Sequence, residues 1–334
     1  MAAIAIISTD VIMMGWLGPR QLAGGALANT LVMPIMHFGF GVATAVAPMV
    51  AQALGARDFA GVRRTVRQGF WVTLAFGAIS AIPLWLSADI LTLLGQGPEV
   101  AELAQGYLRA AVWGLVPMLW VIVLRNFLAV HSRPRAVFVV MLIGIGVNAL
   151  GNYALMFGHF GLPRLELVGA GISTSLVNIF MALTLIGFVL SDRRLGRYRL
   201  FARFWRADWP RFVAVLRLGT PIGLMVLAES ALFAAAGNLM GLIGTAELAA
   251  HAIALQCAAM SFMIPLGISH AATARVGLAA GIGDRDAIGR AGWVAVGLGI
   301  VCTLASASVF WFAGDWVIGF FLDRSVPGNE VVVD

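Results

Sequence analysis

The sequence predicts an all-α integral membrane protein, a two-lobed bundle of parallel six-helix repeats of which about nine transmembrane helices are present. Three observations predict this fold class. Of the 334 residues, 60% are hydrophobic and only 11% are charged. Apolar stretches of about twenty or more residues recur along the chain, and each is long enough to cross a bilayer. A pattern near the start returns about 226 positions later, as in chains built from two related halves.

The composition excludes an ordinary soluble domain, in which about a quarter of the residues are charged. Mean hydropathy is +0.93. The first apolar stretch has no basic leader and contains Asp10, which argues against a secretory signal peptide. The nine predicted spans are, in order, 1–17, 23–54, 66–94, 100–131, 135–158, 168–191, 212–242, 248–281 and 289–321.

The repeat relates the two halves through matching residues at a nearly constant offset. Six spans precede the long polar connection at 192–211, and because six is even, both halves enter the membrane in the same direction. The offset predicts a tenth span that begins just past residue 325, so we expect the second half to lack its last three helices. The matches are Gly18, Leu22, Ala23, Ala26 and Ala28 with Gly244, Leu248, Ala249, Ala252 and Ala254, and Gly55-Ala-Arg-Asp58 with Gly283-Asp-Arg-Asp286.

The basic residues indicate the topology. All 22 are arginines, and most follow the even-numbered spans, whereas the odd-numbered connections hold Arg20, Arg164, Arg324 or none. This is the positive-inside pattern, with the N-terminus and the even connections cytoplasmic. The net charge of +6 is therefore a topology signal and predicts no nucleic-acid partner. We expect an N-lobe of helices 1–6 at 1–191, a cytoplasmic basic linker at 192–211, whose aromatic residues lie among lipid headgroups, and an incomplete C-lobe of helices 7–9 at 212–334.

Acidic residues within the predicted spans are the first candidates for function. A charge at the bilayer centre costs about 2.5–3.5 kcal/mol on insertion scales. Charged residues are therefore retained there mainly where they have a function. Only Asp10 and Glu229 lie well inside predicted spans, although they do not occupy equivalent repeat positions. Asp10 lies between apolar residues and is predicted to exchange a proton or Na⁺ for a substrate. The alternative is a carboxylate buried merely to bond neighbouring helices.

Neutral polar residues add candidate ligands for such a cation. Asn148 and Asn152 are four residues apart in one span and therefore lie on one helix face. Their amide oxygens are hard ligands of the kind that Na⁺ accepts beside one carboxylate, and Thr174 adds a hydroxyl from the next span. The alternative is that these groups only join helices. Four methionines, Met13, Met14, Met33 and Met36, either line an adaptable pocket or face lipid or core.

Enzyme chemistry is not indicated. The sequence has no CxxC, HExxH, GxGxxG, Walker or GxSxG motif in a context that would support it. Cys257 and Cys302 lie inside predicted spans, far apart in sequence, and are interpreted as small apolar residues rather than a disulfide or metal pair. We therefore predict no cofactor beyond a coupling ion.

At these residues the chain resembles the multidrug and toxic compound extrusion (MATE) family, in particular its bacterial NorM-like branch. The resemblance runs the full length of the chain, and the order and spacing of its parts make it specific. Those parts are Asp10-Val-Ile-Met-Met-Gly15, Leu54-Gly55, Arg133-Pro134, Asn148 with Asn152, Gly169-Ala-Gly-Ile-Ser-Thr174, Pro221 with Glu229, Ala250-His-Ala-Ile-Ala254 and Arg275-Val-Gly277.

The resemblance implies a twelve-helix antiporter that exports organic cations, often drugs, while Na⁺ or H⁺ enters. Residue by residue, it assigns Asp10, Asn148, Asn152 and Thr174 to the N-lobe cation site and Glu229 to the C-lobe acidic position. Some members have Asp where this chain has Asn152. The asparagine lowers the negative charge of the site, so the resemblance does not decide whether the coupling ion is Na⁺ or H⁺. The family's further C-lobe acidic residue belongs to the tenth helix, which we expect this sequence to lack.

The sequence thus favours a cation-coupled antiporter that exports organic cations or drugs across the bacterial inner membrane by alternating access. Its partners would be membrane lipid and small organic cations, and it would act as a monomer. One alternative is a flippase of lipid-linked saccharides, for which arginines lining the central cavity would be expected. Another is an inactive, truncated transporter fragment. An integral-membrane enzyme would need clustered His, Asp or Cys at one membrane face.

Overall fold

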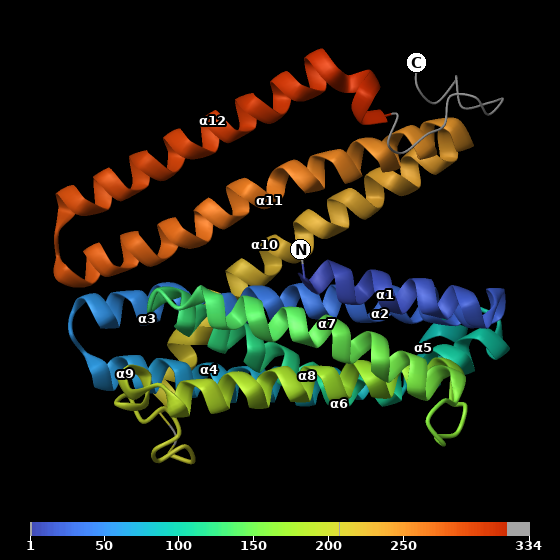
Figure 1. Cartoon of the computed structure of the whole chain (residues 1–334), viewed down its shortest axis with the longest axis horizontal. Helices are drawn as coiled ribbons and strands as arrows, with labels where there is room; N and C mark the ends of the chain where they lie inside the picture. Colours follow the sequence, from blue (N-terminus) through green and yellow to red (C-terminus); the bar gives the residue numbers. More distant parts are fainter. Residues whose placement is uncertain (1, 207, 319–334) are drawn as a thin grey trace. The chain divides into compact units, whose positions relative to one another are not determined.

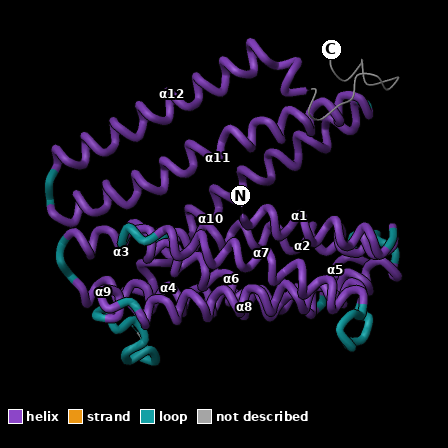
Figure 2. Tube along the Cα trace, in the orientation of Figure 1, coloured by secondary structure: helices purple, strands orange, loops and turns teal. Residues whose placement is uncertain are grey.

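The computed structural model describes residues 2–206 and 208–318, and all regular secondary structure within those ranges is helical. Figure 2 shows these helices joined mostly by short connections. The helices are α1 (Ala2–Leu17), α2 (Pro19–Thr44), α3 (Val46–Gly55), α4 (Phe59–Trp85), α5 (Ser87–Leu93), α6 (Pro98–Val130), α7 (Pro134–Phe157), α8 (Glu166–Ser191), α9 (Arg193–Gly196), α10 (Trp209–Ile243), α11 (Thr245–Ile282) and α12 (Arg285–Ile318).

The predicted all-helical membrane fold is confirmed. Among the described residues, eight helical stretches are long and apolar enough to cross a bilayer. The sixteen residues of α1 fall short of the roughly 20 that a span needs, so the predicted number of nine is approximate. One stretch, Pro19–Gly55, contains both α2 and α3, which meet at Ala45. The tenth span predicted past residue 325 lies outside the described residues.

Several helices begin or end at residues that are typical of helix ends, namely proline, aspartate and glycine. Pro19, Pro98 and Pro134 each stand in the first turn of a helix, where a backbone N–H has no partner within the helix. The Asp58 carboxylate caps α4 by accepting a hydrogen bond from the Gly61 N–H at 2.7 Å. At the other end of α7, Gly158 takes the left-handed conformation, with φ of 75°, that glycine tolerates best.

The chain divides into two compact units, Met1–Leu227 and Ala228–Asp334. In the first unit α6 is central and packs against α8, α2 and α4, while α7 packs against α8 and α1 (Figure 1). In the second unit α11 and α12 lie side by side. The division expected from the repeat, with lobes at 1–191 and 212–334 and a linker at 192–211, stays a prediction.

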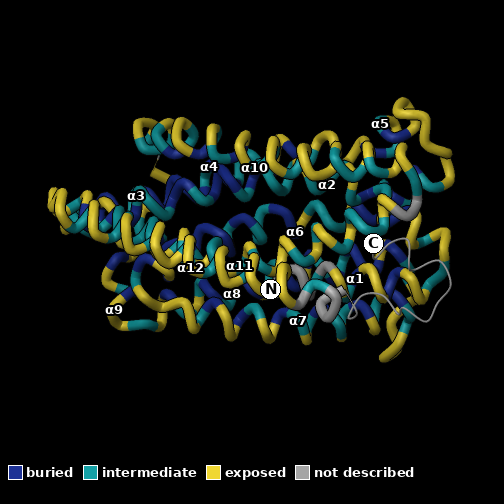
Figure 3. The backbone as a smooth tube through the Cα atoms, turned by 90° about the horizontal axis from the view of Figure 1, so that it is seen from above, coloured by how far each residue is buried: buried dark blue, intermediate teal, exposed yellow. Residues whose placement is uncertain are grey.

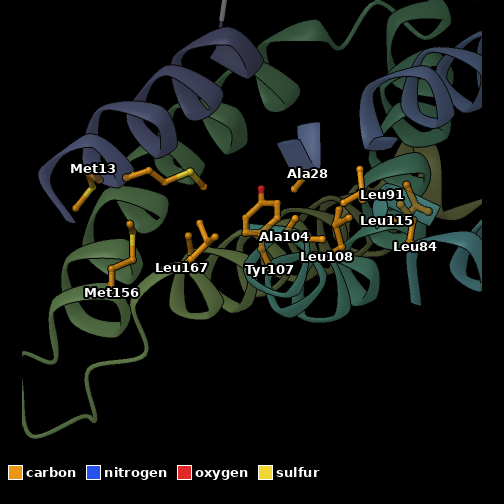
Figure 4. Packing of buried hydrophobic residues seen from close by; sticks show 13 residues of the cluster. Met13, Ala28, Leu84, Leu91, Ala104, Tyr107, Leu108, Leu115, Met156 and Leu167 are labelled. Atoms are coloured by element: carbon orange, nitrogen blue, oxygen red, sulfur yellow. The ribbon is translucent and has the colours of Figure 1, made fainter. Parts of the chain in front are cut away.

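The core of the first unit gathers around α6. Tyr107 and Leu108 of α6 pack in one buried cluster with Met13 of α1, Met156 of α7 and Leu167 of α8 (Figure 4). Figure 3 shows buried segments along α4 and α6. Residues of α2, α4 and α5 also belong to the cluster, which holds α1 against the rest of the unit.

Small residues let two pairs of helices in the first unit approach closely. A Cβ atom on Gly114 of α6 would lie 2.7 Å from the Cα atom of Ser175 on α8. Gly41 of α2 faces the backbone of Gly223 on α10, so that a side chain at either position would overlap the other helix. Close crossings of this kind are typical of membrane proteins, in which small residues let helices pack backbone to backbone.

The polar segment after α8 packs against the first unit. Arg67 of α4 donates a hydrogen bond to the Arg203 carbonyl at 2.9 Å, and Trp71 Nε1 donates to the Phe204 carbonyl at 3.0 Å. The Phe204 ring also stacks on Trp71, with centroids 5.6 Å apart. We expected the aromatic residues of this segment among lipid headgroups. Phe201 and Phe204 pack on α4, and Trp205 is 82% exposed. The position of this segment at the membrane interface stays a prediction.

Candidate functional site

The candidate site is centred on the Asp10 carboxylate, which is buried near the middle of α1. Three side chains from two other helices donate hydrogen bonds to it. On α7, Asn152 Nδ2 lies 2.6 Å and Asn148 Nδ2 lies 3.0 Å from Asp10 Oδ1. On α8, Thr174 Oγ1 lies 3.1 Å from Asp10 Oδ2. The four residues that the sequence assigned to one cation site are therefore brought together in the structure.

Helical spacing and close packing position these donors. Asn148 and Asn152 are one turn apart on α7, both are fully buried, and both face α1. Ser173 Oγ donates to the Asn148 carbonyl at 3.3 Å, which ties α7 to α8 beside the site. Gly151 lies against the Ser173 side chain, and a Cβ there would overlap the hydroxyl. The glycine thus permits the approach that places Thr174 within reach of Asp10.

The site has unused oxygen ligands. The Oδ1 atoms of Asn148 and Asn152 are both buried and have no hydrogen-bond partner. A buried polar atom without a partner costs about 1–3 kcal/mol, so a proton or cation that engaged these oxygens would remove that cost. Rotation of either amide by half a turn would present its oxygen to Asp10, where it could accept a proton from the carboxyl group or bind a cation.

A cavity of about 200 Å³ opens beside the carboxylate within the first unit. Asp10 and Thr174 line it, whereas Asn148 and Asn152 lie behind Asp10 and are not among its lining residues. Asp10 therefore connects the buried amides to the cavity. Three of the four methionines singled out in the sequence line this cavity, and the fourth, Met13, belongs to the buried core instead. The lining methionines are Met14, Met33, Met36, Met118, Met141 and Met181.

Sequence reasoning missed four polar residues of the cavity wall. The cavity is also lined by Asn29 on α2, Tyr107 and Arg125 on α6, and Asn178 on α8. Arg125 could have been singled out from the sequence, because it is a lone charged residue at the end of the apolar run Val121-Ile-Val-Leu-Arg125. Asn178 is one helical turn beyond Thr174 and therefore shares its face. Tyr107 had no signal of its own, since a tyrosine in an apolar helix is common.

Glu229 is the second acidic candidate from the sequence. It is exposed on α10 and belongs to the second unit, while the Asp10 cluster belongs to the first. Its predicted role therefore stays a prediction. Among the described residues there is no group of three or more His, Cys, Asp or Glu side chains that could hold a metal ion. The candidate cation ligands are thus one carboxylate and neutral oxygens, a set that suits H⁺ or Na⁺ better than a transition metal.

A helical membrane fold with a buried, hydrogen-bonded carboxylate beside a cavity defines a multi-pass membrane transporter. The MatE family model matches residues 4–154 and 221–326, which is more than half of the chain. The chain belongs to the MatE family. As the sequence predicted, its members are transporters rather than enzymes.

Two bacterial relatives illustrate the similarity. The chain is 45% identical over 333 residues to a probable multidrug resistance protein NorM of Rhizobium meliloti, covering 100% of this chain and 71% of the relative. It is 42% identical over 334 residues to a protein of the same description from Mesorhizobium japonicum, covering 98% of this chain and 71% of that one.

Solved structures share the fold at lower identity. A MATE transporter in complex with MaD5 superposes with a TM-score of 0.85 at 20% identity, covering 99% of this chain and 74% of that chain. The eukaryotic MATE transporter AtDTX14 gives a TM-score of 0.81 at 20% identity, covering 100% of this chain and 72% of that one. These structures support the two-lobed helical fold class that the sequence predicted.

Proposed function

We propose that this protein exports organic cations, including drugs, in exchange for H⁺ or Na⁺. The relatives described as multidrug resistance proteins support the export of drugs. The observation that carries the coupling is the Asp10 carboxylate, which is buried in the apolar helix α1, accepts three hydrogen bonds and lines a cavity. A charged group in an apolar environment raises the free energy of the folded protein, so it is retained mainly where it serves a function.

The coupling ion acts at the Asp10 cluster. In the charged state the two amide N–H groups and the Thr174 hydroxyl stabilise the carboxylate. When H⁺ or Na⁺ binds, the negative charge is neutralised and the amide oxygens become useful as acceptors or ligands. For transport, the ion must bind the outward-open and inward-open states with different affinity, because an ion that binds both equally shifts nothing. Neutralisation of Asp10 would favour the state that releases the organic cation.

The remaining features of the proposal follow from the sequence. The arginine distribution supports a cytoplasmic N-terminus. We further propose that the protein acts as a monomer, surrounded by lipid of the bacterial inner membrane. Glu229 would supply the acidic group of the second lobe. No cofactor is required beyond the coupling ion, which is itself transported.

The test is Asp10→Asn, measured as ethidium efflux from bacterial cells that lack their own drug exporters. Asparagine preserves the size of the side chain but can neither bind a proton nor attract Na⁺ by charge. We expect efflux to fall about tenfold or to background. Asp89→Asn is the matched control, because Asp89 is an exposed carboxylate on α5 that does not line the cavity. Undiminished export by Asp10→Asn, at equal expression, would refute the assignment.

A further inference from the structure

The cavity beside Asp10 contains a second charged side chain of opposite sign. Asp10 and Arg125 are the two charged residues among those that line it. Arg125 belongs to α6, whereas Asp10 belongs to α1, and the wall between them is formed largely by methionines and other apolar side chains. The cavity therefore presents a carboxylate and a guanidinium to the same bound molecule.

The Arg125 guanidinium is packed but not neutralised. Its central carbon lies 5.4 Å from the centroid of the Phe40 ring, which also lines the cavity. Its Nη2 atom is buried and has no hydrogen-bond partner. Among the residues that the structure describes, no carboxylate forms an ion pair with Arg125. Arg125 as a whole is half-buried, but this donor is withdrawn from solvent, so an anionic partner in the cavity would stabilise the guanidinium.

Arg109 on the same helix shows what a structural arginine looks like in this protein. It is exposed, its Nε donates to the Trp85 carbonyl at 3.1 Å, and its guanidinium lies over the Trp85 ring. Arg125 has a ring contact but no comparable hydrogen bond. A role in setting the membrane topology, as an arginine at the cytoplasmic end of a span, does not explain the position of Arg125 either. Arg125 lies five residues before the end of α6, about 7.5 Å along the axis, and an arginine that only reached for headgroups would not bury Nη2 against a cavity.

We propose that Arg125 binds an anionic group of the transported molecule, so that the cavity selects zwitterionic amphiphiles as well as simple cations. This inference rests on the proposed function, because it assumes that organic cations enter the cavity. A guanidinium presents donors in a planar fork that matches a carboxylate. The methionine wall and Phe40 would accommodate the apolar body between the two charges.

A matched pair of dyes tests the proposal. Rhodamine B is a zwitterion with a free benzoate, and rhodamine B methyl ester is a cation of nearly the same shape. Binding of each dye to the purified full chain in neutral detergent is measured by fluorescence polarisation. We expect Arg125→Gln to weaken binding of rhodamine B about tenfold, the loss of one charged hydrogen-bonded pair, while binding of the ester changes less than about twofold.

Two further variants make the comparison sharp. Arg109→Gln removes the same charge from the same helix outside the cavity and should leave the affinities for both dyes unchanged. Arg125→Lys keeps the charge but loses the planar fork, so rhodamine B should bind a few-fold more weakly and the ester as before. If Arg125→Gln does not give a monodisperse protein, Arg125→Lys carries the test.

The possible failures are distinguishable. Equal loss of both dyes in the Arg125 variants would overturn the inference and leave the proposed function standing. Absence of binding of either dye to the unaltered chain would defeat the proposed function and the inference with it. If Arg125→Gln leaves both dyes unaffected but weakens binding of fluorescent phosphatidylglycerol, the anionic group is a lipid phosphate. The inference would then be overturned in favour of a lipid-handling protein.

Discussion

The Asn152 Nδ2 atom lies 2.6 Å from Asp10 Oδ1, the shortest of the three hydrogen bonds that hold this carboxylate. An amide at position 152 lets Asp10 carry a negative charge without a bound cation. It also means that the cluster contains a single acidic group. The choice of coupling ion should therefore depend on what stands at position 152.

Asn152→Asp should make the site depend more strongly on Na⁺. Two carboxylates at this distance repel each other unless a cation lies between them, and Na⁺ can satisfy both. We expect the affinity for Na⁺ to rise about tenfold, measured by radioactive Na⁺ binding to the purified protein. Asn152→Leu is the control and should not raise the affinity. Equal Na⁺ affinity in the Asp variant and the unaltered protein would contradict the proposed ligand set.

Gly41→Val should destabilise the first unit. A side chain at Gly41 overlaps the backbone of Gly223 on α10, so the two helices must separate. Overpacking of this kind costs about 1–3 kcal/mol and should lower the melting temperature by several degrees. Gly146→Val is the matched control, because a Cβ at Gly146 on α7 meets no atom within 4 Å. Thermal unfolding in detergent measures both variants, and equal melting temperatures would show that the close crossing is unimportant.

Trp71→Leu should loosen the polar segment that follows α8. The substitution removes the hydrogen bond from Trp71 Nε1 to the Phe204 carbonyl and the stacking of the two rings. The loss is about 1–2 kcal/mol, so trypsin should cleave after Arg203 and Arg206 roughly tenfold faster. Trp113→Leu is the control, since Trp113 on α6 is 68% exposed. Unchanged cleavage in Trp71→Leu would mean that this contact does not hold the segment.

Asp192, at the start of α9, gives a pH dependence with a defined sign. Its pKa lies below the ordinary value, mainly because the Arg194 backbone N–H donates to the carboxylate, with further help from the Leu195 N–H and Arg133. A lowered pKa means that the charged form stabilises the fold. The contribution of the carboxylate to the free energy of unfolding is complete above its unfolded-state pKa of about 4. This contribution is lost as the pH falls through the folded-state pKa, which is lower.

Asp192→Asn should therefore lower the melting temperature at pH 7 relative to the unaltered protein. The difference should shrink as the pH falls below about 4, because the native carboxyl group then becomes protonated and neutral as well. Thermal unfolding in detergent across this range measures it. A difference that stays constant with pH would show that the carboxylate charge plays no part.

Much of the candidate site could be predicted because its signals are local. A carboxylate within an apolar helix is rare, and two asparagines one turn apart must share a face, so Asp10, Asn148 and Asn152 stand out from the sequence alone. Thr174 was a candidate as a hydroxyl in the next span, and the family resemblance assigned it to the same site. The helix ends at Pro98, Pro134 and Gly158 depend on residues whose backbone preferences are strong, and those helices were predicted closely.

The other features of the site and of the fold depend on tertiary packing, which local sequence patterns do not predict. Nothing in the run around Arg125 tells whether its side chain reaches toward headgroups or into a cavity, because that depends on the position of Phe40 on another helix. The docking of Phe201 and Phe204 depends likewise on Phe70 and Trp71, more than 130 positions earlier.

The six methionines in the cavity wall also expose the protein to oxidative damage. Each thioether can be oxidised to a sulfoxide, which replaces a pliable apolar surface with a polar, chiral one. A wall that adapts to many molecular shapes because it is rich in sulfur is for the same reason sensitive to peroxide and hypochlorite. Repair by methionine sulfoxide reductases would then matter to a cell under oxidative stress as much as renewed synthesis of the protein.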